Sequence, residues 1–478
     1  MIPLRRSLRF LLLSIGLISV VQAQRRAPVP AQPAWIVQPE WVRAHEEFLA
    51  SDALAGRGSG TRDEWIAATY IGSELREFGV EPAGDGSYVQ KVELEQEVLT
   101  APPSLKVVAG NTENVFEFGK DFRVFRLSGQ SLSGPLQKID MEKQAAPPEI
   151  KKGAIVLVTL PADPAAHRTA FRQALQFIRS GAAALLIPEP AQIANQSSEL
   201  PRLSPRIKGI PSGEEMELNV LTSTADAAAK ISSLPEGSTV DFVTTTKPAD
   251  PQFTYNAVGI IRGSDPTLKS QAILLSAHLD HLGVGKPVNG DSIYNGADDD
   301  ASGVTAVLEL ARALAHGKKP RRTVLFALFG SEETGRGYGA VYYREKPPIP
   351  LMDIAANLEF EMIGRPDPKV QPNELWLTGW ERSNLGPELA SHGAKLVPDP
   401  HPEENFFARS DNYALALKGV VAQTVSSYGL HSDYHRPSDD IAHLDLAHMT
   451  AAIQSLVEPI RWLANSDFKP QWKPGKQP

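Results

Sequence analysis

The sequence contains no cysteine among its 478 residues. This absence excludes disulfide bonds, metal sites built from thiolates, and attachment to a lipid through an N-terminal cysteine. Any metal ion that the protein binds must therefore be held by histidine nitrogen atoms and carboxylate oxygen atoms.

The sequence also lacks an excess of positive charge. The formal net charge is −8, from 48 lysine and arginine residues against 56 aspartate and glutamate residues, and both signs are scattered along the chain. Proteins that bind nucleic acid usually present a basic face, so we expect no nucleic-acid partner. With 42% hydrophobic residues, the chain is long enough to form two or three globular domains.

A long hydrophobic run occurs only at the N-terminus. Three arginines precede an apolar stretch over residues 10–21, and Val21-Gln22-Ala23 offers a small-residue cleavage site. This pattern is typical of a secretory signal peptide, which we predict over residues 1–23, with an uncleaved membrane anchor as the alternative. After cleavage we expect a periplasmic or secreted protein without a stable membrane span, beginning with a proline-rich linker over residues 24–40.

The remaining chain divides by its pattern of apolar residues. Residues 41–119 are helical and then turn-rich, and residues 120–248 contain short β-like runs around a helical stretch at 168–182. The second segment carries no cluster of histidines or acids, which indicates an inserted module. Residues 249–466 form the main domain, and residues 467–478 are expected to be a flexible tail.

From Tyr255 onward, apolar runs typical of buried strands alternate with helical patterns. The predicted strands are residues 257–263, 272–278, 323–329, 354–360 and 419–426, and a helix is predicted over 301–316. This alternation indicates an α/β fold with three layers, in which helices cover both faces of a mostly parallel sheet. In such sheets, sites form outside the carboxyl ends of the strands.

Histidines or acids follow four of these predicted strands and also occupy the loop before the predicted helix. They are His278, Asp280 and His281; Asp298, Asp299 and Asp300; Glu332 and Glu333; Glu361; and His431 and His435. A single such residue is usually an ordinary solvated loop residue. Five groups in a fold that gathers the strand ends predict one functional site.

The three adjacent aspartates need a partner for their charge, because neighbouring carboxylates repel one another. A helix N-terminus is one explanation, since the predicted helix begins directly after them, and a metal ion is the other. We expect Asp300 and Ser302 to cap the helix. His281 and His431 are expected to support the site rather than to bind metal.

The residue types favour metal-assisted hydrolysis. Nitrogen and oxygen ligands suit zinc, with cobalt or manganese as substitutes, and a carboxylate can bridge two ions about 3.5–4 Å apart. Such a pair lowers the pKa of a bridging water, and a nearby carboxylate can take its proton. One of Glu332 and Glu333 can bind metal while the other faces the water, and Asp280 is placed to orient His278.

Six segments resemble one known family, the co-catalytic zinc aminopeptidases of peptidase clan MH, relatives of glutamate carboxypeptidase and glutaminyl cyclase. The segments are SAHLDHLG, NGADDDASG, GSEETG, NLEFEMIGR, RSDNYALALKGV and DYHRPSDD, in the family's order, and LAGRGSGT is similar to its N-terminal stretch. The resemblance implies the zinc exopeptidase fold, with residues 41–119 as the N-terminal part of the peptidase domain and 249–466 as its catalytic part.

The resemblance also implies a role for each motif residue. Two Zn²⁺ ions would be held by His278, Asp298, Glu333, Glu361 and His435. Asp298 would bridge both ions, with a cis peptide bond to Asp299. Glu332 would be the general base, and Asp280 would orient His278. Glu361 stands where the family usually has aspartate, and Glu359 is its competitor for that position.

The inserted module is similar to the protease-associated domain, through KKGAIVLV and IRSGAAALLIPEP. The function implied is an exported exopeptidase that removes N-terminal residues from peptides through a metal-bridging hydroxide. The alternatives are a dizinc carboxypeptidase or dipeptidase, a one-metal transferase like glutaminyl cyclase, and an inactive binding module.

Overall fold

The computed structural model describes residues 35–127, 131–143, 148–188, 203–211 and 218–478. The predicted signal peptide and most of the predicted linker lie outside the described residues. The residues from Val37 onward form one compact unit.

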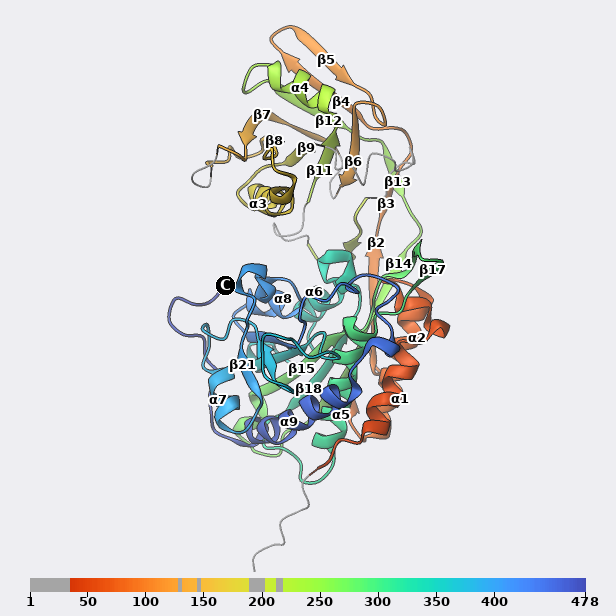
Figure 1. The fold of residues 1–478 in the computed structure, drawn as a ribbon, viewed down its shortest axis with the longest axis vertical. Coiled ribbons are helices and arrows are strands. Elements are labelled where there is room, and N and C mark those ends of the chain that lie inside the picture. Colours follow the sequence, from red (N-terminus) through yellow and green to blue (C-terminus); the bar gives the residue numbers. More distant parts are fainter. Residues whose placement is uncertain (1–34, 128–130, 144–147, 189–202, 212–217) are drawn as a thin grey trace, which may run out of the picture. The chain divides into compact units, whose positions relative to one another are not determined.

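Strands follow one another without an α-helix over the described part of residues 81–159, and helices largely alternate with strands from Gly303 onward (Figure 1). The helices are α1 (Pro39–Leu49), α2 (Arg62–Glu77), α3 (His167–Arg179), α4 (Ala225–Ser233), α5 (Gly303–Ala315), α6 (Tyr338–Glu345), α7 (Leu385–Ser391), α8 (Asn412–Ala416) and α9 (Leu446–Asn465). The strands are β1 (Glu81–Pro82), β2 (Val89–Glu95), β3 (Glu97–Leu99), β4 (Ser104–Ala109), β5 (Thr112–Phe116), β6 (Phe122–Arg126), β7 (Leu132–Asp140), β8 (Ile155–Thr159), β9 (Ala184–Pro188), β10 (Arg206–Ile207), β11 (Val220–Ser223), β12 (Thr239–Val243), β13 (Thr246–Pro248), β14 (Gln252–Ile261), β15 (Ala272–His278), β16 (Gly283–Val288), β17 (Asp291–Tyr294), β18 (Val324–Phe329), β19 (Ile354–Phe360), β20 (Leu375–Leu377), β21 (Leu396–Pro398) and β22 (Val421–Ser426).

A ten-stranded sheet forms the centre of the main domain, in the order β10-β2-β14-β18-β15-β19-β22-β20-β21, with β1 beside β14. Its four central strands, β18, β15, β19 and β22, are parallel, as the sequence predicts. Strand β14 runs antiparallel to β18, so the sheet is mixed towards its edges. Every residue of β15 and β18 is buried, which explains their uninterrupted apolar sequences.

Helices cover both faces of this sheet, as expected for the zinc exopeptidase fold. On one face, Ala340 and Tyr343 of α6 and Leu415 of α8 join a buried cluster with side chains from the strands. Helices α1, α2, α5 and α9 pack against one another on the other face, where α5 contacts β15 (Figure 1). The main core therefore has three layers.

Side chains at the helix starts account for several boundaries. Thr61 accepts hydrogen bonds from the backbone N–H groups of Asp63 and Glu64 and so caps α2. Asp445 caps α9 in the same way through the N–H of His448. These caps satisfy backbone donors that the first turn of a helix leaves without partners.

A second sheet has eight strands in the order β5-β4-β12-β7-β8-β9-β11-β6. It begins at Ser104, earlier than the predicted boundary at residue 120, because the hairpin of β4 and β5 packs Leu105, Val107 and Phe116 into this sheet's core with Phe242. Alternating apolar residues predict a strand, but they carry no information about which sheet the strand joins.

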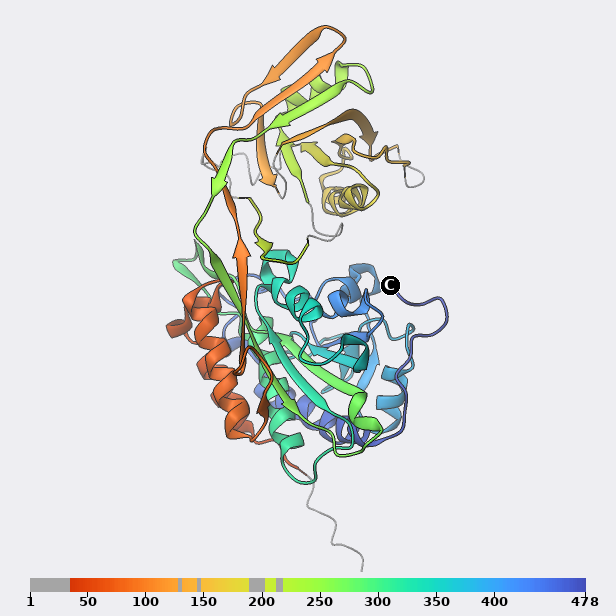
Figure 2. The same cartoon turned by 180° about the vertical axis from the view of Figure 1, so that it is seen from behind.

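The chain leaves the ten-stranded sheet through β3 and returns through β13, and these two strands pair antiparallel (Figure 2). The predicted flexible tail is not free. Trp472 donates a hydrogen bond from Nε1 to Gly419 O at 3.2 Å, and its ring lies edge-on to Phe407. Within the described residues, no helix has the length and apolar character needed to cross a bilayer.

Candidate metal centre and active site

The carboxyl ends of the central strands bring three of the predicted ligands together around Asp299. Its Oδ1 lies 3.1 Å from His278 Nε2, and its Oδ2 lies 3.3 Å from His435 Nε2. His435 Nε2 is also 3.2 Å from Glu333 Oε2. His278 ends β15, Glu333 follows β18, and His435 follows β22, so the predicted convergence of strand ends is present.

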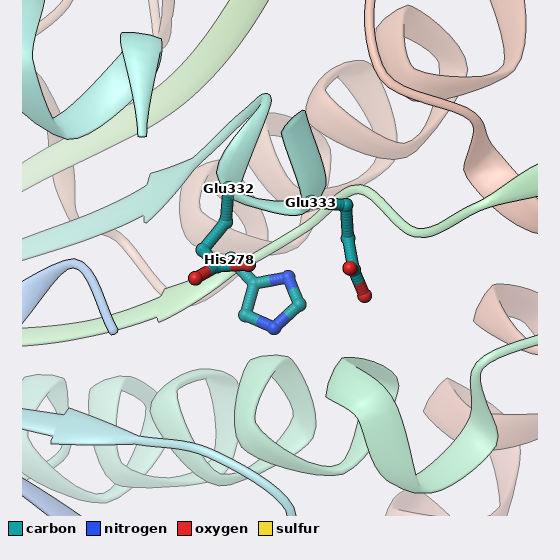
Figure 3. A group of neighbouring side chains, drawn as sticks. All are labelled: His278, Glu332 and Glu333. Carbon is teal, nitrogen blue, oxygen red and sulfur yellow. The ribbon is translucent and has the colours of Figure 1, made fainter. Parts of the chain in front are cut away.

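Two overlapping groups of side chains have the spacing of a metal site. Ligand atoms of His278, Glu332 and Glu333 lie within 4.8 Å of one another, and so do those of His281, Asp299 and Glu333. Figure 3 shows the imidazole of His278 between the side chains of Glu332 and Glu333. Glu333 belongs to both groups.

Asp298 does not occupy the position predicted for the bridging carboxylate. Its Oδ1 accepts a hydrogen bond from Gly364 N at 2.7 Å, and its Oδ2 lies 2.9 Å from His431 Nε2. The cis peptide bond joins Asp299 to Asp300, not Asp298 to Asp299. The predicted position is wrong by one residue, because the backbone turns the side chain of Asp298 towards Gly364 and that of Asp299 towards the histidines.

Asp300 caps helix α5, as predicted, and also ties two strand ends together. Its Oδ1 accepts from the N–H groups of Gly303 and Met362, and its Oδ2 accepts from His278 N. Ser302 does not cap the helix with its side chain; its hydroxyl donates instead to Asp298 O at 2.8 Å.

Asp280 orients His278 through its backbone rather than through its carboxylate. The ring Nδ1 of His278 lies 3.1 Å from Asp280 O but 3.9 Å from its Oδ1. The carboxylate instead accepts from the backbone N–H groups of Glu332 and Glu333 and from the hydroxyl of Ser59. It therefore fixes the loop that carries both glutamates, a contact that the spacing of two residues from His278 could not reveal.

The geometry separates the two glutamates that compete for the third carboxylate position. Glu361 lines the same cavity as Asp299, Glu332 and Glu333. Glu359 is buried in β19, and its Oε2 accepts from Asn412 N at 2.5 Å. Asn412 donates from its side chain to two backbone carbonyls, so it serves packing there. This arrangement favours Glu361.

A second layer of side chains supports the ligand loops. Asp439 accepts from the backbone N–H groups of Asp298 and Asp299, both at 3.0 Å, and pairs with Arg365. His281 Nδ1 lies 2.8 Å from Glu333 Oε1. His281 and His431 thus each contact a carboxylate of the site.

Three buried side chains of the candidate site, Glu332, His278 and Asp299, have strongly shifted pKa values. Burial raises the pKa of Glu332 well above its usual range, reinforced by Glu333 and Glu361 and opposed by His278. Burial is the largest influence on His278 and works against its charge, but the hydrogen bond with Asp299 and the charges of Asp300 and Glu332 together outweigh burial and raise the pKa of this imidazole. Burial also works against the charge of Asp299, but its contacts with His278, His435 and His281 together lower the pKa of this carboxylate.

The residues fit the binding of a divalent cation. His435 Nε2 is buried beside two carboxylates, 3.3 Å from Asp299 Oδ2 and 3.2 Å from Glu333 Oε2. Several buried carboxylates face a cavity with few cations, and a metal ion is the usual compensation for such a charge. The donor set of imidazoles and carboxylates, without sulfur, is the one that zinc accepts.

Sequence reasoning missed Arg57, although the motif around it was noted. Arg57 is fully buried and donates only to carbonyl oxygens: Leu49 O at 2.5 Å, Asn295 O at 2.7 Å, Gly296 O at 2.9 Å and Leu279 O at 3.0 Å. It thereby joins the loop after His278 to the loop before Asp299. The only sign of this role in the sequence is the position of Arg57 between two glycines, Gly56 and Gly58.

The neighbouring glycine explains why the motif is rich in this residue. Gly56 has φ +71°, and a Cβ there would lie 2.2 Å from Tyr294 O. Only glycine allows this close approach. The motif therefore serves close packing against the loops that carry the candidate ligands.

Comparison with known proteins finds a family that part of the chain resembles. Residues 256–458 match the model of peptidase family M28. The match spans every candidate ligand described above, and it confirms the family predicted from the motifs.

Individual relatives match this chain either over a short stretch or at low identity. Leupeptin-inactivating enzyme 1 of Streptomyces exfoliatus is 31% identical over 115 residues, which is 24% of each chain. The probable lipoprotein aminopeptidase LpqL of Mycobacterium tuberculosis is 24% identical over 83% of this chain and 71% of its own length. The chain thus spans about a quarter of the length of the first relative.

A solved structure of an aminopeptidase from Aneurinibacillus sp. strain AM-1 has the same fold. Its TM-score is 0.52 at 19% identity, and the alignment covers 92% of this chain and 96% of that one. The likeness confirms the zinc exopeptidase fold over nearly the whole chain.

Proposed function

We propose that the protein is an exported zinc aminopeptidase that hydrolyses N-terminal residues from peptides. The observation that carries this proposal is the position of Asp299 between His278 and His435, with Glu333 beside it. Two zinc ions would be held by His278, Asp299, Glu333, Glu361 and His435.

Bound zinc would supply Lewis acidity, which polarises a carbonyl and makes water more acidic at neutral pH. Glu332 is the group of the chain that moves the proton. It lies within 4.8 Å of His278 and Glu333, and its loop is held by the bond from Glu332 N to Asp280 Oδ1 at 3.0 Å. We infer that its carboxylate takes a proton from the attacking water and gives it to the leaving amine.

The cavity beside Glu332 supports cleavage at a free N-terminus. Four carboxylates line it, Asp299, Glu332, Glu333 and Glu361, and aromatic side chains complete it: Trp376, Phe406, Tyr428 and Tyr434. The acids suit a positively charged α-amine. The ring of Trp376 stacks on that of Phe406 at 5.3 Å, which gives a flat apolar surface for one side chain.

Export rests on the predicted signal peptide over residues 1–23, with cleavage near Gln24. The eight-stranded segment would be a protease-associated domain, and it supplies none of the proposed metal ligands. A zinc-loaded protein purified from the periplasm or medium, with its N-terminus at residue 24, is the expected result.

The test is a peptide library incubated with the zinc-loaded protein, with and without N-terminal acetylation, and read by mass spectrometry. We expect peptides with free N-termini to lose residues from that end and acetylated peptides to stay intact. Shortening from the C-terminus, or cyclised N-terminal glutamine without cleavage, would contradict the proposal.

Glu332→Gln tests the role of the base in the same assay. The variant should retain the zinc content of the unmodified protein, because glutamine keeps the shape of the side chain. Its rate should fall by about 10²- to 10⁴-fold, the usual contribution of a general base. Turnover at the normal rate would rule out this role.

A further inference from the structure

One wall of the cavity beside Glu332 is held from behind by a buried carboxylate. Trp376 in β20 lines this cavity, and its Nε1 donates a hydrogen bond to Asp367 Oδ2 at 3.0 Å. Asp367 is 1% exposed and is not one of the residues that line the cavity. The hydrogen bond therefore directs the polar edge of the indole out of the cavity and towards Asp367.

Asp367 is itself fixed through both of its oxygen atoms. His401 Nε2 lies 2.8 Å from the same Oδ2, and Lys369 N donates to Oδ1 at 2.8 Å. The side chain of His401 is as deeply buried as that of Asp367. Because hydrogen bonds to an ionised acceptor are short and strong, the carboxylate has one well-defined position.

A lysine at the surface determines how His401 binds Asp367. Lys369 Nζ lies 3.1 Å from His401 Nδ1, and the lysine side chain is half exposed. An ammonium group can only donate, so Nδ1 accepts this bond and the ring hydrogen lies on Nε2, facing the carboxylate. A chain of hydrogen bonds thus runs from Lys369 to the indole of Trp376.

Ring contacts complete the support of this wall. The indole of Trp376 stacks on Phe406 at 5.3 Å, and the imidazole of His401 lies edge-on to both rings, at 6.3 and 6.1 Å. Stacking fixes the distance between two rings but allows them to slide past each other. The directional hydrogen bond to Asp367 removes this freedom from Trp376.

The position of the indole matters because the cavity is small. Its volume is about 40 Å³, and one water needs roughly 10–15 Å³ on this measure, so the cavity has room for about three waters. A small aliphatic side chain fits such a space. A phenyl ring would need the indole to move.

We propose that Asp367 is a positioning residue that fixes Trp376 and thereby limits the cavity to small aliphatic side chains of the N-terminal residue. This inference rests on the proposed function, which places that residue in the cavity. His401 acts through Asp367, and neither of these two side chains touches the substrate.

The test measures kcat/KM of the zinc-loaded full chain for alanine p-nitroanilide and phenylalanine p-nitroanilide. We expect a preference for alanine of about tenfold or more, the usual effect of a side chain that a pocket cannot accommodate. Equal kcat/KM for the two amides, or a preference for phenylalanine, would overturn this inference and leave the proposed aminopeptidase activity standing. Hydrolysis of neither amide would remove both.

Asp367→Leu removes the acceptor oxygens but keeps a branched side chain of similar size. The indole can then shift, so the preference for alanine should fall by about three- to tenfold, the effect of one lost hydrogen bond. The fall should come from a lower KM for phenylalanine, with kcat for alanine little changed. A purely structural role would lower kcat/KM for both amides equally, and that result would contradict the inference.

Asp367→Asn is the conservative variant, because its amide oxygen can still accept from the indole. It should retain most of the preference for alanine. An equal loss in Asp367→Asn and Asp367→Leu would contradict the role of this hydrogen bond.

His401→Phe decides the question if Asp367→Leu does not fold. Phenylalanine keeps a ring beside Trp376 but cannot donate to Asp367, so the preference should fall about two- to fivefold. Glu46→Gln is the control, because Glu46 is equally buried and accepts a hydrogen bond from Thr305, but does not line the cavity. Its preference should match that of the unmodified protein, and an unchanged preference in His401→Phe would overturn the inference.

Discussion

The two large sheets share one arrangement, a run of four parallel strands. In the main sheet these strands are β18, β15, β19 and β22, and in the second sheet they are β7, β8, β9 and β11. Parallel strands bring their carboxyl ends to one edge in both cases. Only the main sheet has histidines and acids grouped at that edge among the described residues.

The strands of the second sheet end in residues that do not form a group of histidines and acids. Strand β7 ends at Asp140, which pairs with the exposed Lys143 at 2.8 Å, and β8 and β11 end at Thr159 and Ser223. A hydrogen bond from Lys143 lowers the pKa of Asp140. In both sheets the topology brings the carboxyl ends of the parallel strands together. The residue types at those ends decide whether they can form a metal site.

The strongest test of this comparison exchanges one acid in each sheet. Asp299→Asn should remove most bound zinc and reduce activity by about a thousandfold or more, because a neutral amide cannot replace an anionic ligand. Asp140→Asn should change neither. Zinc content by mass spectrometry and the peptide assay provide the readings, and zinc retained in Asp299→Asn would contradict the proposed role of Asp299 as a ligand.

A smaller effect is expected from the buried arginine that joins the metal loops. Arg57→Lys cannot reach four carbonyl oxygens, so the loops after His278 and before Asp299 should lose alignment. Zinc affinity, measured by competition with a chelator, should fall about 10- to 100-fold, as for other residues behind metal ligands.

Arg322→Lys is the matched control, since Arg322 is as fully buried and donates to Phe468 O. If both variants lost zinc equally, Arg57 would matter only for general stability. If only Arg57→Lys lost zinc, zinc binding at the strand ends of the main sheet would depend on a residue outside those strand ends.

The smallest effect concerns stability and pH. Burial raises the pKa of Glu46 to about 8, only partly offset by its hydrogen bond with Thr305. Between pH 4.5 and 8 the unfolded chain has lost this proton while the folded chain keeps it, so stability falls as pH rises. Glu46→Gln should remove this slope.

The melting temperature of Glu46→Gln, relative to the unmodified protein, should therefore rise by a few degrees between pH 5 and pH 8. Glu47→Gln, on the exposed side of α1, should show no such trend. A constant difference for Glu46→Gln across this range would mean that burial does not keep Glu46 protonated.

Much of the site could be predicted because the strand ends are recorded in the sequence as apolar runs followed by polar residues. His278, Glu333 and His435 were found in this way, and the structure brings them together. Three identical aspartates in a row gave no such signal. The choice between Asp298 and Asp299 depends on the bond from Gly364 N and the turn around Gly296, which are long-range and conformational features.

The contacts of Asp280 and Arg57 could not be predicted for a related reason. Both side chains bind backbone groups of distant loops, and every residue has these groups, so the sequence does not show which of them are bound. The start of the second sheet at Ser104 was missed because a strand's own sequence does not identify its partner.

The way in which the chain leaves and re-enters the main sheet has a consequence for how the second sheet is joined to it. Leu94 pairs with Gln252, and beyond them Leu99 pairs with Thr246, so the outgoing and returning strands are neighbours throughout. Two adjacent antiparallel strands are what a simple hairpin would provide at this place. The main sheet is thus interrupted in the sequence but continuous in space, and a short turn in place of the second sheet would need no change in the register of its strands.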